Sequence, residues 1–534
     1  MSSHACALST GTIAVASRRA RAPAPRRARA IPPTRAASAS SPPETTSTSP
    51  AGARAPAPYA GPPRVVILGG GFGGLYTALK LDALTWPDAS KRPIVTLIDR
   101  AERFVFKPML YELVNETMSD WEVAPTFEDL LKPTAVRYTR GDVSGVIPGD
   151  ALEFKDGTVG SSGGGVVELA SGESVEYDWL IVAVGTATSD AVVPGSKDHA
   201  IPLSTLEDAR RLAGAMRDVE AACESGGSAM KRDVAVIGGG LSGVELAGVV
   251  AERLKGKATV TLFASEAGIM PGSPPGQRDA ARKTLDAAGV ATRVGARATA
   301  VNEPSDSYAG GVSAAASVTY TEADGEPTTE DYDVVCWAVG QRVESPESWP
   351  FPRDERTNKI AAEKTLRVTG HARVFAVGDV ARLSDDSSSD ARTRNDAYVA
   401  SPPPARFDVL PATAQVAFQQ ADYAAWNVWS SLSSRPLLPF KYQHIGDMMV
   451  LGKTDAAVAL PVGDATLDGP VAALLRRAAY LYRMPTNEHR AKLATSWLEQ
   501  GAEFAAKEGP GILKSLGVPV PDFLAPNQGP NSRT

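Results

Sequence analysis

Two runs of apolar, mostly β-branched residues each lead into a glycine-rich turn and then into a helical pattern. The first run spans 64–68 and enters the glycines of 69–74. The second spans 234–237 and enters the glycines of 238–243. An unbroken apolar run bounded by glycine is typical of a strand buried on both faces, so the order strand, turn, helix predicts parallel α/β units.

Further apolar runs predict the other strands of both units. Residues 94–98 and 258–263 each follow one of the helical patterns. Three later runs end in glycine, at 177–186, 332–340 and 374–379. We therefore expect an α/β fold with two Rossmann-like dinucleotide-binding domains.

The first glycine turn has the spacing that a dinucleotide requires. Gly69, Gly71 and Gly74 satisfy G-x-G-x-x-G, in which the first glycine makes the tight turn, the second admits a pyrophosphate, and the third packs helix against strand. The pyrophosphate would lie at the helix N-terminus. Asp99 ends the next strand, where its carboxylate can accept hydrogen bonds from an adenosine ribose.

The second turn repeats this pattern with one difference. Gly238, Gly240 and Gly243 form a second fingerprint, so two dinucleotides are expected. The following strand runs into Ala264 and Ser265, without the acid that NAD-selective folds place there. Glu266 lies nearby, and no neighbouring Arg offers a clear clamp for a 2′-phosphate. The sequence thus predicts that both NADPH and NADH are used.

Composition narrows the classes of protein. The chain has 534 residues, of which 43% are hydrophobic and 22% charged, which suits about three globular units. Its three cysteines, Cys6, Cys223 and Cys336, form no Cys-x-x-Cys pair. We therefore expect no dithiol redox centre and no metal site built on cysteine.

The N-terminal 60 residues differ in charge from the rest. They hold eight Arg, no Lys and one acid, Glu44, in an Ala-, Ser- and Pro-rich context. This composition predicts a transit peptide, with a retained disordered basic arm as the alternative. The remainder carries 47 basic against 60 acidic residues, and that balance does not suit a nucleic-acid partner.

The order of these motifs resembles the flavoprotein superfamily in which an FAD domain contains an inserted NAD(P) domain. The resemblance implies 61–200 as the first part of the FAD domain, 201–345 as the NAD(P) domain and 346–430 as the second FAD part. A C-terminal region, 431–534, would contact a membrane surface. The implied FAD residues are Gly69, Gly71, Phe72, Gly73, Gly74, Asp99, Lys107, Gly185, Thr186, Gly378 and Asp379, and the implied NAD(P) residues are Gly238, Gly240, Gly243, Glu245, Ser265 and Gly340.

Three segments resemble the type II NAD(P)H:quinone oxidoreductases more narrowly. Residues 104–112 match F-x-F-x-P-x-L-Y-E, and 412–420 match an A-Q-x-x-x-Q-Q element beside the quinone pocket. Residues 440–448 and 481–490 are similar to the C1-type members of cyanobacteria and plastids. The resemblance implies FAD as cofactor, NADPH or NADH as donor, and a membrane quinone such as plastoquinone or a phylloquinone precursor as acceptor.

No essential acid or base is expected, because the flavin carries the chemistry. Glu245, Gln415, Gln419 and His444 are the candidates for placement and proton supply, and Gln415, Gln419 and Gln420 are the candidates for the quinone. Gln415 and Gln419 are four residues apart, so on a helix their amides share one face. The alternative for them is a polar helix packed on loops, and for His444 an ordinary structural hydrogen bond.

One segment predicts contact with a membrane surface. Residues 471–483 place apolar side chains at helical spacing, and 470–495 hold five Lys or Arg against Glu488. A core-packing or dimer-forming helix is the alternative, so a homodimer is a possible partner. Residues 383–406 are rich in Ser, Asp and Arg, and this composition predicts a solvated loop insertion.

Two other functions share this architecture. A sulfide:quinone reductase would need a cysteine pair near the flavin, and an apoptosis-inducing-factor-like flavoprotein would act mainly by binding. The transit-peptide composition and the C1-type resemblance favour the chloroplast, at the thylakoid surface or in plastoglobules, with the mitochondrion as a further location.

Overall fold

The computed structural model describes most of the chain between residues 61 and 500. The described ranges are 61–149, 151–153, 159–161, 163–189, 192–225, 232–306, 314–322, 325–383, 410–461 and 465–500. The chain divides into two units, Met1–Tyr59 and Ala60–Thr534, and every described residue belongs to the second. The predicted transit peptide and nearly all of the 383–406 insertion lie outside the described residues.

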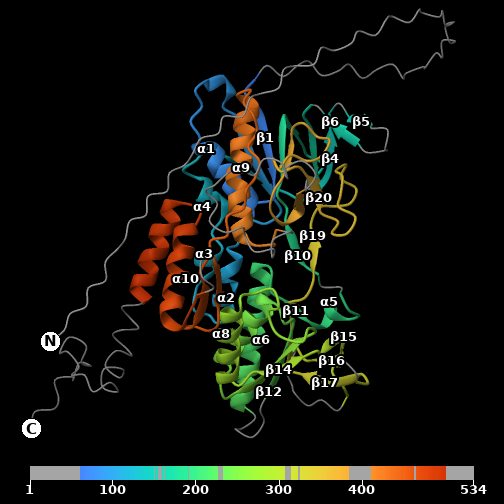
Figure 1. Ribbon diagram of the computed structural model, residues 1–534, viewed down its shortest axis with the longest axis vertical. Coiled ribbons are helices and arrows are strands. Elements are labelled where there is room, and N and C mark those ends of the chain that lie inside the picture. The colour runs from blue at the N-terminus through green and yellow to red at the C-terminus, as the bar shows by residue number, and fades with distance from the viewer. Residues whose placement is uncertain are drawn as a thin grey trace, which may run out of the picture. The chain divides into compact units, whose positions relative to one another are not determined.

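A five-stranded parallel sheet forms the first domain (Figure 1). Its strand order is β21-β9-β1-β2-β3, with the bounds β1 Arg64–Leu68, β2 Ile94–Asp99, β3 Arg137–Arg140, β9 Trp179–Val182 and β21 Val374–Ala376. Alternate residues of β1 pack into two different hydrophobic clusters, Val65 and Ile67 into one, Val66 and Leu68 into the other. Both faces of the strand are therefore buried, which explains its unbroken apolar run.

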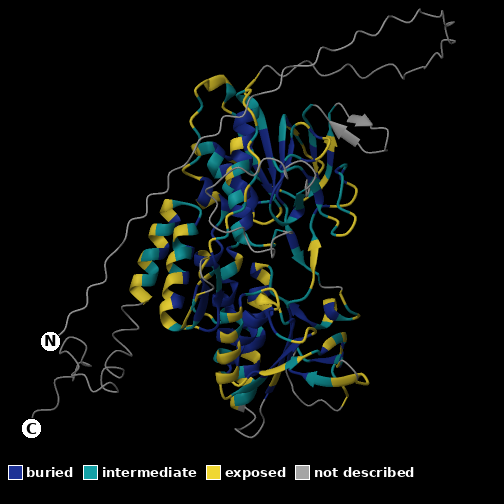
Figure 2. Ribbon diagram, viewed as in Figure 1, coloured by how far each residue is buried: buried dark blue, intermediate teal, exposed yellow. Residues whose placement is uncertain are grey.

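A second five-stranded parallel sheet forms the other domain. Its order is β11-β18-β12-β13-β14, with β11 Ile201–Pro202, β12 Arg232–Ile237, β13 Ala258–Ala264, β14 Ala291–Val294 and β18 Val334–Trp337. Its helices are α6 Leu206–Ser225, α7 Leu241–Arg253 and α8 Pro275–Ala287. Figure 2 shows that the strands of both domains are largely buried, whereas exposed residues gather on the outer helices and loops.

The second domain is inserted into the first by two strands that pair with each other. β10 (Thr186–Thr188) leaves the first domain and β19 (Gln341–Val343) returns to it, and the two are antiparallel. β9 and β21 are neighbours in the first sheet although the whole second sheet lies between them in sequence. The predicted nesting of one dinucleotide-binding domain inside another is confirmed.

Smaller elements cover the two sheets. The antiparallel sheets are β4-β7-β8 and β15-β16-β17, and the two-stranded pairs are β5-β6 and β20-β22. Their bounds are β4 Val143–Pro148, β5 Ala151–Glu153, β6 Val159–Ser161, β7 Gly165–Leu169, β8 Ser174–Tyr177, β15 Arg297–Asn302, β16 Ala316–Thr321, β17 Thr328–Tyr332, β20 Ile360–Ala362 and β22 Ala381–Leu383. The remaining helices of this part are α1 Phe72–Ala83, α2 Leu110–Val114, α3 Asp120–Val123, α4 Phe127–Leu131 and α5 Ser196–His199, with the short 3-10 helices η1 Ala89–Lys91, η2 Lys107–Met109 and η3 Gly378–Val380.

The C-terminal elements pack onto the first domain and α7. Helix α9 (Ala414–Leu432) lies along α1 (Figure 1). A sheet of β23 (Asp447–Val450), β24 (Ala456–Ala459) and β25 (Thr466–Asp468) follows, and α10 (Gly469–Arg483) packs against β24. Residues 487–500 are again helical. Within the described ranges, no helix combines the length and the apolar character that crossing a bilayer demands.

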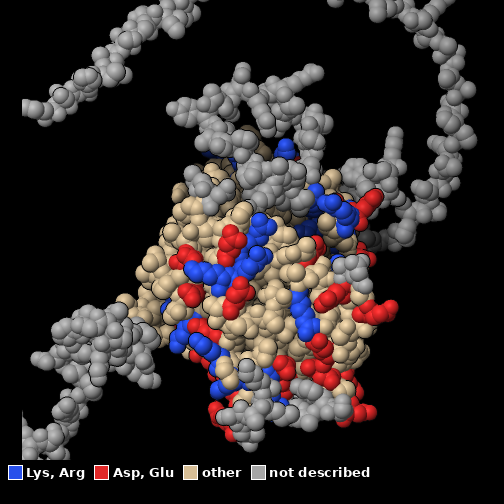
Figure 3. Space-filling model, turned by 60° about the horizontal axis from the view of Figure 1, so that its bottom comes forward, with Lys and Arg blue, Asp and Glu red and all other residues tan. Residues whose placement is uncertain are grey.

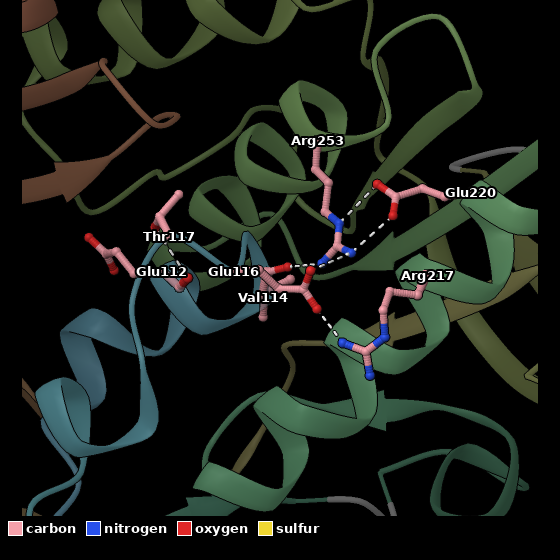
Figure 4. Close-up of polar contacts among 7 residues, drawn as sticks. All are labelled: Glu112, Val114, Glu116, Thr117, Arg217, Glu220 and Arg253. Carbon is pink, nitrogen blue, oxygen red and sulfur yellow. Dashed lines mark hydrogen bonds and ion pairs between the residues drawn. The ribbon is translucent and has the colours of Figure 1, made fainter. Parts of the chain in front are cut away.

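A polar network joins the two domains beside α2 (Figure 4). The guanidinium of Arg253 on α7 donates to both carboxylate oxygens of Glu220 at 3.1 Å, and also to the carbonyl oxygen of Val114. Glu116, in the loop after α2, pairs with Arg253 at 3.4 Å and with Arg217 of α6. The loop after α2 is thereby tied to both α6 and α7.

Charges of both signs are interspersed on the face turned forward in Figure 3. Uncharged residues separate small groups of acidic and basic side chains there. The acidic residues therefore do not form one continuous negative patch on this face.

Candidate functional site

The first glycine turn has the close packing that its spacing predicts. Gly69 has φ +94°, which a residue with a side chain rarely adopts. A Cβ on Gly74 would lie 1.8 Å from the carbonyl oxygen of Gly69, so helix α1 can approach the turn only with glycine there. A Cβ on Gly71 would meet nothing within 4 Å. The turn thus leaves open space at the N-terminus of α1, where a pyrophosphate binds in such folds.

Asp99 at the end of β2 completes this half of the site. Its carboxylate accepts hydrogen bonds from the backbone N–H of Gly70 at 2.5 Å and of Ala101 at 2.7 Å. Burial raises the pKa of Asp99, while the two backbone donors lower it. The carboxylate keeps further acceptor capacity for ribose hydroxyls.

One cleft of about 1060 Å³ collects the residues predicted to hold FAD. Ten of the eleven line it, and the eleventh, Gly74, is buried beneath the turn. At its far side Gly378 has φ +75° and donates its N–H to Gln420 Oε1 at 2.6 Å. Asp379 accepts from the Thr186 hydroxyl at 3.2 Å. An extended dinucleotide such as FAD fits this cleft. The space at the glycine turn suits its pyrophosphate, the Asp99 carboxylate suits a ribose, and the Gly378–Asp379 pair lies along the same cleft.

Lys107 projects into this cleft from η2. Its Nζ donates to the carbonyl oxygen of Thr186 at 3.4 Å. Surrounding protein atoms lower the pKa of Lys107 by desolvation, and the charge of Asp379 counteracts this. The ammonium therefore supplies positive charge to a cleft suited to an anionic cofactor.

The second glycine turn has the same packing as the first. Gly238 has φ +128°, and a Cβ on Gly243 would lie 1.8 Å from the carbonyl oxygen of Gly238. Leu68 pairs with Ile98 in the first sheet, and Ile237 pairs with Phe263 in the second. Ala264 therefore occupies the position that Asp99 has in the first domain.

The other predicted NAD(P) residues are less tightly grouped. Gly240 leaves open space at the start of α7, Ser265 is exposed, and Gly340 has φ +78° before β19. Of the six, only Glu245 lines the large cleft. Leu241 and Ser242 at the start of α7 line it as well. Leu206, Glu207 and Arg210 of α6 also line it, so both helices bring the second domain to the cleft.

Glu245 is buried at the wall of the cleft. Its Oε1 accepts the backbone N–H of Val450 at 2.9 Å. Burial raises the pKa of Glu245 to about 7, although Val450, the Tyr111 hydroxyl and the charge of Arg476 all favour the carboxylate. A carboxyl with such a pKa can take up and release a proton near neutral pH.

The glutamine element has other partners than the predicted quinone. Gln415 donates to the carbonyl oxygen of Gly446 at 3.0 Å and accepts from the Tyr442 hydroxyl at 2.6 Å. Gln419 forms a pair of hydrogen bonds with the backbone of Gln443, at 2.7 and 2.9 Å. The shared face of the two amides therefore fixes the 442–446 loop, as the alternative of a polar helix packed on loops predicts. Gln415 lines the cleft, and Gln419 does not.

His444 is held within that loop. Its Nδ1 lies 3.3 Å from the Tyr442 hydroxyl and its Nε2 lies 3.7 Å from Asp447 Oδ2. Asp447 lines the cleft, and His444 is one step behind it. The histidine is thus placed to influence the cleft through Asp447 rather than by facing it.

Sequence reasoning missed an aromatic wall on one side of the cleft. Phe72 packs at ring-centroid distances of 5.3 Å from Phe106 and 4.8 Å from Phe418, and Tyr480 of α10 packs 5.3 Å from Phe106. All four rings line the cleft. Phe72 was among the implied FAD residues, and Phe106 and Phe418 stood within matched motifs. Tyr480 carried only the helical apolar pattern that also marks ordinary core, and nothing in the sequence indicated that the four rings form one wall.

The two cysteines among the described residues lie away from the cleft. Cys336 is buried in β18, where burial raises its pKa to about 12, and the Cys223 thiol donates to the carbonyl oxygen of Lys257. Neither lines the cleft. Among the described residues, no group of His, Cys, Asp and Glu could hold a metal ion. The cysteine pair that sulfide:quinone reductase chemistry needs is therefore missing from this part of the chain.

The chain is similar to known oxidoreductases over most of its length. The family model described as pyridine nucleotide-disulphide oxidoreductase matches residues 63–421. The chain is 40% identical over 464 residues to an alternative NAD(P)H-ubiquinone oxidoreductase C1, chloroplastic/mitochondrial, from Arabidopsis thaliana, covering 84% of this chain and 83% of that protein. It is 36% identical over 439 residues to the demethylphylloquinone reductase NdbB of a Synechocystis species, covering 82% of this chain and 96% of that protein.

A solved structure has the same fold. The structure of NDH2 from Plasmodium falciparum in complex with NADH matches with a TM-score of 0.65 at 17% identity, covering 82% of this chain and 98% of that chain. At this identity the likeness establishes the nested arrangement of two dinucleotide-binding domains.

Proposed function

The chain belongs to the pyridine nucleotide-disulphide oxidoreductases and, within them, to the type II NAD(P)H:quinone oxidoreductases, and from this premise we propose which residues serve each reactant. The protein is an FAD-dependent enzyme that passes two electrons from NAD(P)H to a quinone. FAD supplies the two-electron redox chemistry, and the protein supplies binding, orientation and exclusion of water.

The observation that supports the residue assignment is the single cleft. The turn at Gly69–Gly74, Asp99, Lys107 and Gly378–Asp379 would hold FAD along it. The start of α7, with Glu245, would face the nicotinamide, because this helix follows the second glycine turn and lines the cleft. The quinone ring would lie against the aromatic wall, between Phe418 and the loop that Gln415 fixes.

The acceptor we propose is a plastoquinone or the naphthoquinone precursor of phylloquinone. The names of the two curated relatives, one a ubiquinone oxidoreductase and the other a demethylphylloquinone reductase, support a quinone with a long apolar tail. An aromatic wall suits such a ring better than a polar pocket would, because ring stacking adds to the burial of apolar area.

Anaerobic flavin spectroscopy tests this function. NADH and NADPH are expected to bleach the flavin of the purified full-length protein, and a short-chain benzoquinone or naphthoquinone should restore its colour rapidly. Phe418→Ala should slow reoxidation about tenfold or more while leaving bleaching unchanged, since it removes one face of the proposed quinone site. Bleaching that no quinone reverses would contradict the assignment, and would favour a flavoprotein that acts mainly by binding.

We also propose that α10 binds a membrane surface. Its buried side is formed by Ala472, Ala473, Arg476 and Tyr480. Its other side presents apolar residues to solvent: Val471 and Tyr482 are 70% exposed, Leu474 71% and Leu475 42%. Leu498 of the next helix is 75% exposed. Arg476 points inward, so the nearby positive charge comes from Arg477, Arg483, Arg490 and Lys492.

Vesicle flotation tests the membrane proposal. Wild-type protein is expected to float with vesicles that contain anionic lipid, and Leu474→Glu should abolish flotation. Ile147→Glu is the matched control, because Ile147 is an exposed apolar residue of β4, outside the proposed surface. A second copy of the chain is the competing occupant. A homodimer in solution that Leu474→Glu dissociates, without flotation of the wild type, would overturn the membrane proposal.

The coarse location follows from the relatives. One is chloroplastic/mitochondrial in a plant and the other comes from a cyanobacterium, which supports a plastid enzyme. Within the plastid we propose the thylakoid surface or the plastoglobule, because both present quinone at a lipid surface. Fractionation of plastids followed by immunodetection distinguishes them.

A further inference from the structure

A buried ion pair joins the C-terminal helix α10 to α2, next to residues that line the cleft. Arg476 of α10 donates to Glu112 Oε1 of α2 at 2.5 Å, and their side chains are 3% and 6% exposed. Among the described residues, Arg476 Nε and Nη1 and Glu112 Oε2 have no hydrogen-bond partner. Breaking such a pair leaves a costly buried charge, so both members are expected to stay charged together.

The pair borders the groups that surround Glu245. Tyr111 precedes Glu112 on α2, and its hydroxyl stabilises the Glu245 carboxylate by a hydrogen bond. The guanidinium of Arg476 lies 5.1 Å from the centre of the Tyr480 ring, and Tyr480 lines the cleft as Tyr111 does. The pair is therefore separated from Glu245 by two tyrosines, within a region that excludes water.

The two members act on Glu245 with opposite signs. The positive charge of Arg476 lowers the pKa of Glu245, and the negative charge of Glu112 raises it by a smaller amount. The other groups that face Glu245 are Tyr111 of α2, Tyr480 of α10, and the backbone N–H of Val450 in β23, which also favours the carboxylate. The net effect of the pair favours loss of the Glu245 proton.

Turnover needs a proton from solution. NAD(P)H gives up a hydride, which carries two electrons and one proton, whereas conversion of a quinone to its quinol adds two electrons and two protons. The second proton must therefore enter through the protein. Glu245 is a buried carboxyl in the cleft wall whose proton equilibrium lies near neutral pH.

We infer that Glu112 and Arg476 are positioning residues that control when Glu245 takes up and releases the proton of turnover. This inference deepens the proposed function and rests on it. It assigns the C-terminal helix a part in the chemistry of the cleft in addition to any contact with a membrane. Arg476 touches neither cofactor nor quinone and acts through Glu245.

The test is the pH dependence of flavin reoxidation by excess short-chain quinone, the half-reaction that takes up the second proton, in a single turnover of the full-length holoenzyme reduced beforehand with NAD(P)H, from about pH 5 to about pH 9. Glu245→Gln should abolish an inflection that the wild type shows near neutrality. Arg476→Met should move that inflection up, and Glu112→Gln should move it down, each by up to roughly one pH unit, or about tenfold in the proton equilibrium. Arg476→Lys keeps the charge and should restore the wild-type inflection.

Opposite shifts of the pH inflection in Arg476→Met and Glu112→Gln would distinguish an electrostatic effect on Glu245 from a loss of packing. If loss of packing were responsible, both variants would slow reoxidation without opposite movement of the inflection, and that result would overturn the inference. Should Arg476→Met not fold, Glu112→Gln alone decides, because it keeps the hydrogen-bond acceptor for Arg476. Wild-type flavin that no quinone reoxidises at any pH would contradict the proposed function, whereas wild-type reoxidation without opposite shifts in the two variants would overturn this inference alone.

Discussion

The two glycine turns share their backbone geometry and differ in the residue that meets the turn from the next strand. In both, the first glycine has a positive φ, and a Cβ on the last glycine would lie 1.8 Å from the first glycine's carbonyl oxygen. In the first turn the N–H of Gly70 donates to Asp99, whereas in the second Ala264 stands at the matching position. One turn thus carries a built-in ribose acceptor, and the other does not.

The presence of Asp99 at the first turn and of Ala264 at the second fits a cofactor that stays bound at the first turn and a substrate that exchanges at the second. A carboxylate that binds the ribose hydroxyls holds a dinucleotide at its far end, and it also repels a 2′-phosphate. Ala264 does neither. We therefore predict that the second turn accepts both NADH and NADPH.

The largest expected effect comes from alanine at the last glycine of each turn. Gly74→Ala should leave the purified protein with little FAD, whereas Gly243→Ala should keep its FAD and need about 30-fold more NAD(P)H, because overpacking costs about 2 kcal/mol. The ratio of flavin to protein absorbance and the KM for NAD(P)H measure these effects. Gly272→Ala is the control, since a Cβ there meets nothing within 4 Å. Loss of FAD from both variants alike would break the comparison.

Exchanging the residue that meets each turn should have an intermediate effect. Asp99→Asn is expected to weaken FAD binding about tenfold, and Ala264→Asp should lower kcat/KM for NADPH about tenfold with little change for NADH. Equilibrium dialysis of FAD and parallel kinetics with the two nucleotides measure them. Gly272→Ala again serves as the control, since a Cβ there meets nothing within 4 Å. An equal loss with NADH and NADPH would contradict the role given to Ala264.

The smallest expected effect concerns the pH dependence of stability. Tyr76 and Glu245 both stand two residues after the last glycine of their turns. The pKa of Glu245 is raised to about 7 from an ordinary 4.5, so between these values the folded chain holds a proton that the unfolded chain has lost. Stability therefore falls as pH rises through this window. Glu245→Gln should flatten the decline of Tm between about pH 5 and about pH 8.

Tyr76→Phe provides the matched comparison for that measurement. Burial raises the pKa of Tyr76 well above its ordinary value, so Tyr76 stays protonated between about pH 5 and about pH 8. The variant loses a hydrogen bond from Tyr76 to the carbonyl oxygen of Arg483 and should melt roughly 2 °C lower at every pH. If its Tm changed with pH differently from that of the wild type, the contrast between the two turns would not hold.

The strands and glycine turns were predictable because their causes are local. A strand buried on both faces must be apolar along its length, and the fingerprint spacing follows from the turn itself. The partners of Gln415 and Gln419 were not predictable in this way. The loop they fix lies 24 to 31 residues further along the chain, and nothing in its sequence indicates that its backbone satisfies the two amides.

Arg476 shows most clearly what the helical pattern of apolar residues could not predict. On an amphipathic helix an arginine is expected at the surface, so the helical pattern predicts Arg476 among the positive charges facing a membrane. The structure corrects this, because its partner Glu112 lies 364 residues earlier in the chain. Distance in sequence hides such a pair, whereas the exposure of the apolar residues Leu474 and Tyr482 leaves the membrane interpretation of this helix as a prediction.

The pairing of β10 with β19 has a consequence for how such proteins can diversify. Because the strand that leaves the first domain and the strand that returns to it lie side by side, the ends of the inserted segment are neighbours in space. A cassette cut at these two strands can be replaced by the corresponding segment of a relative without relocating either end of the host. Recombination at this junction would exchange nucleotide preference in one event while leaving the flavin and quinone machinery in place.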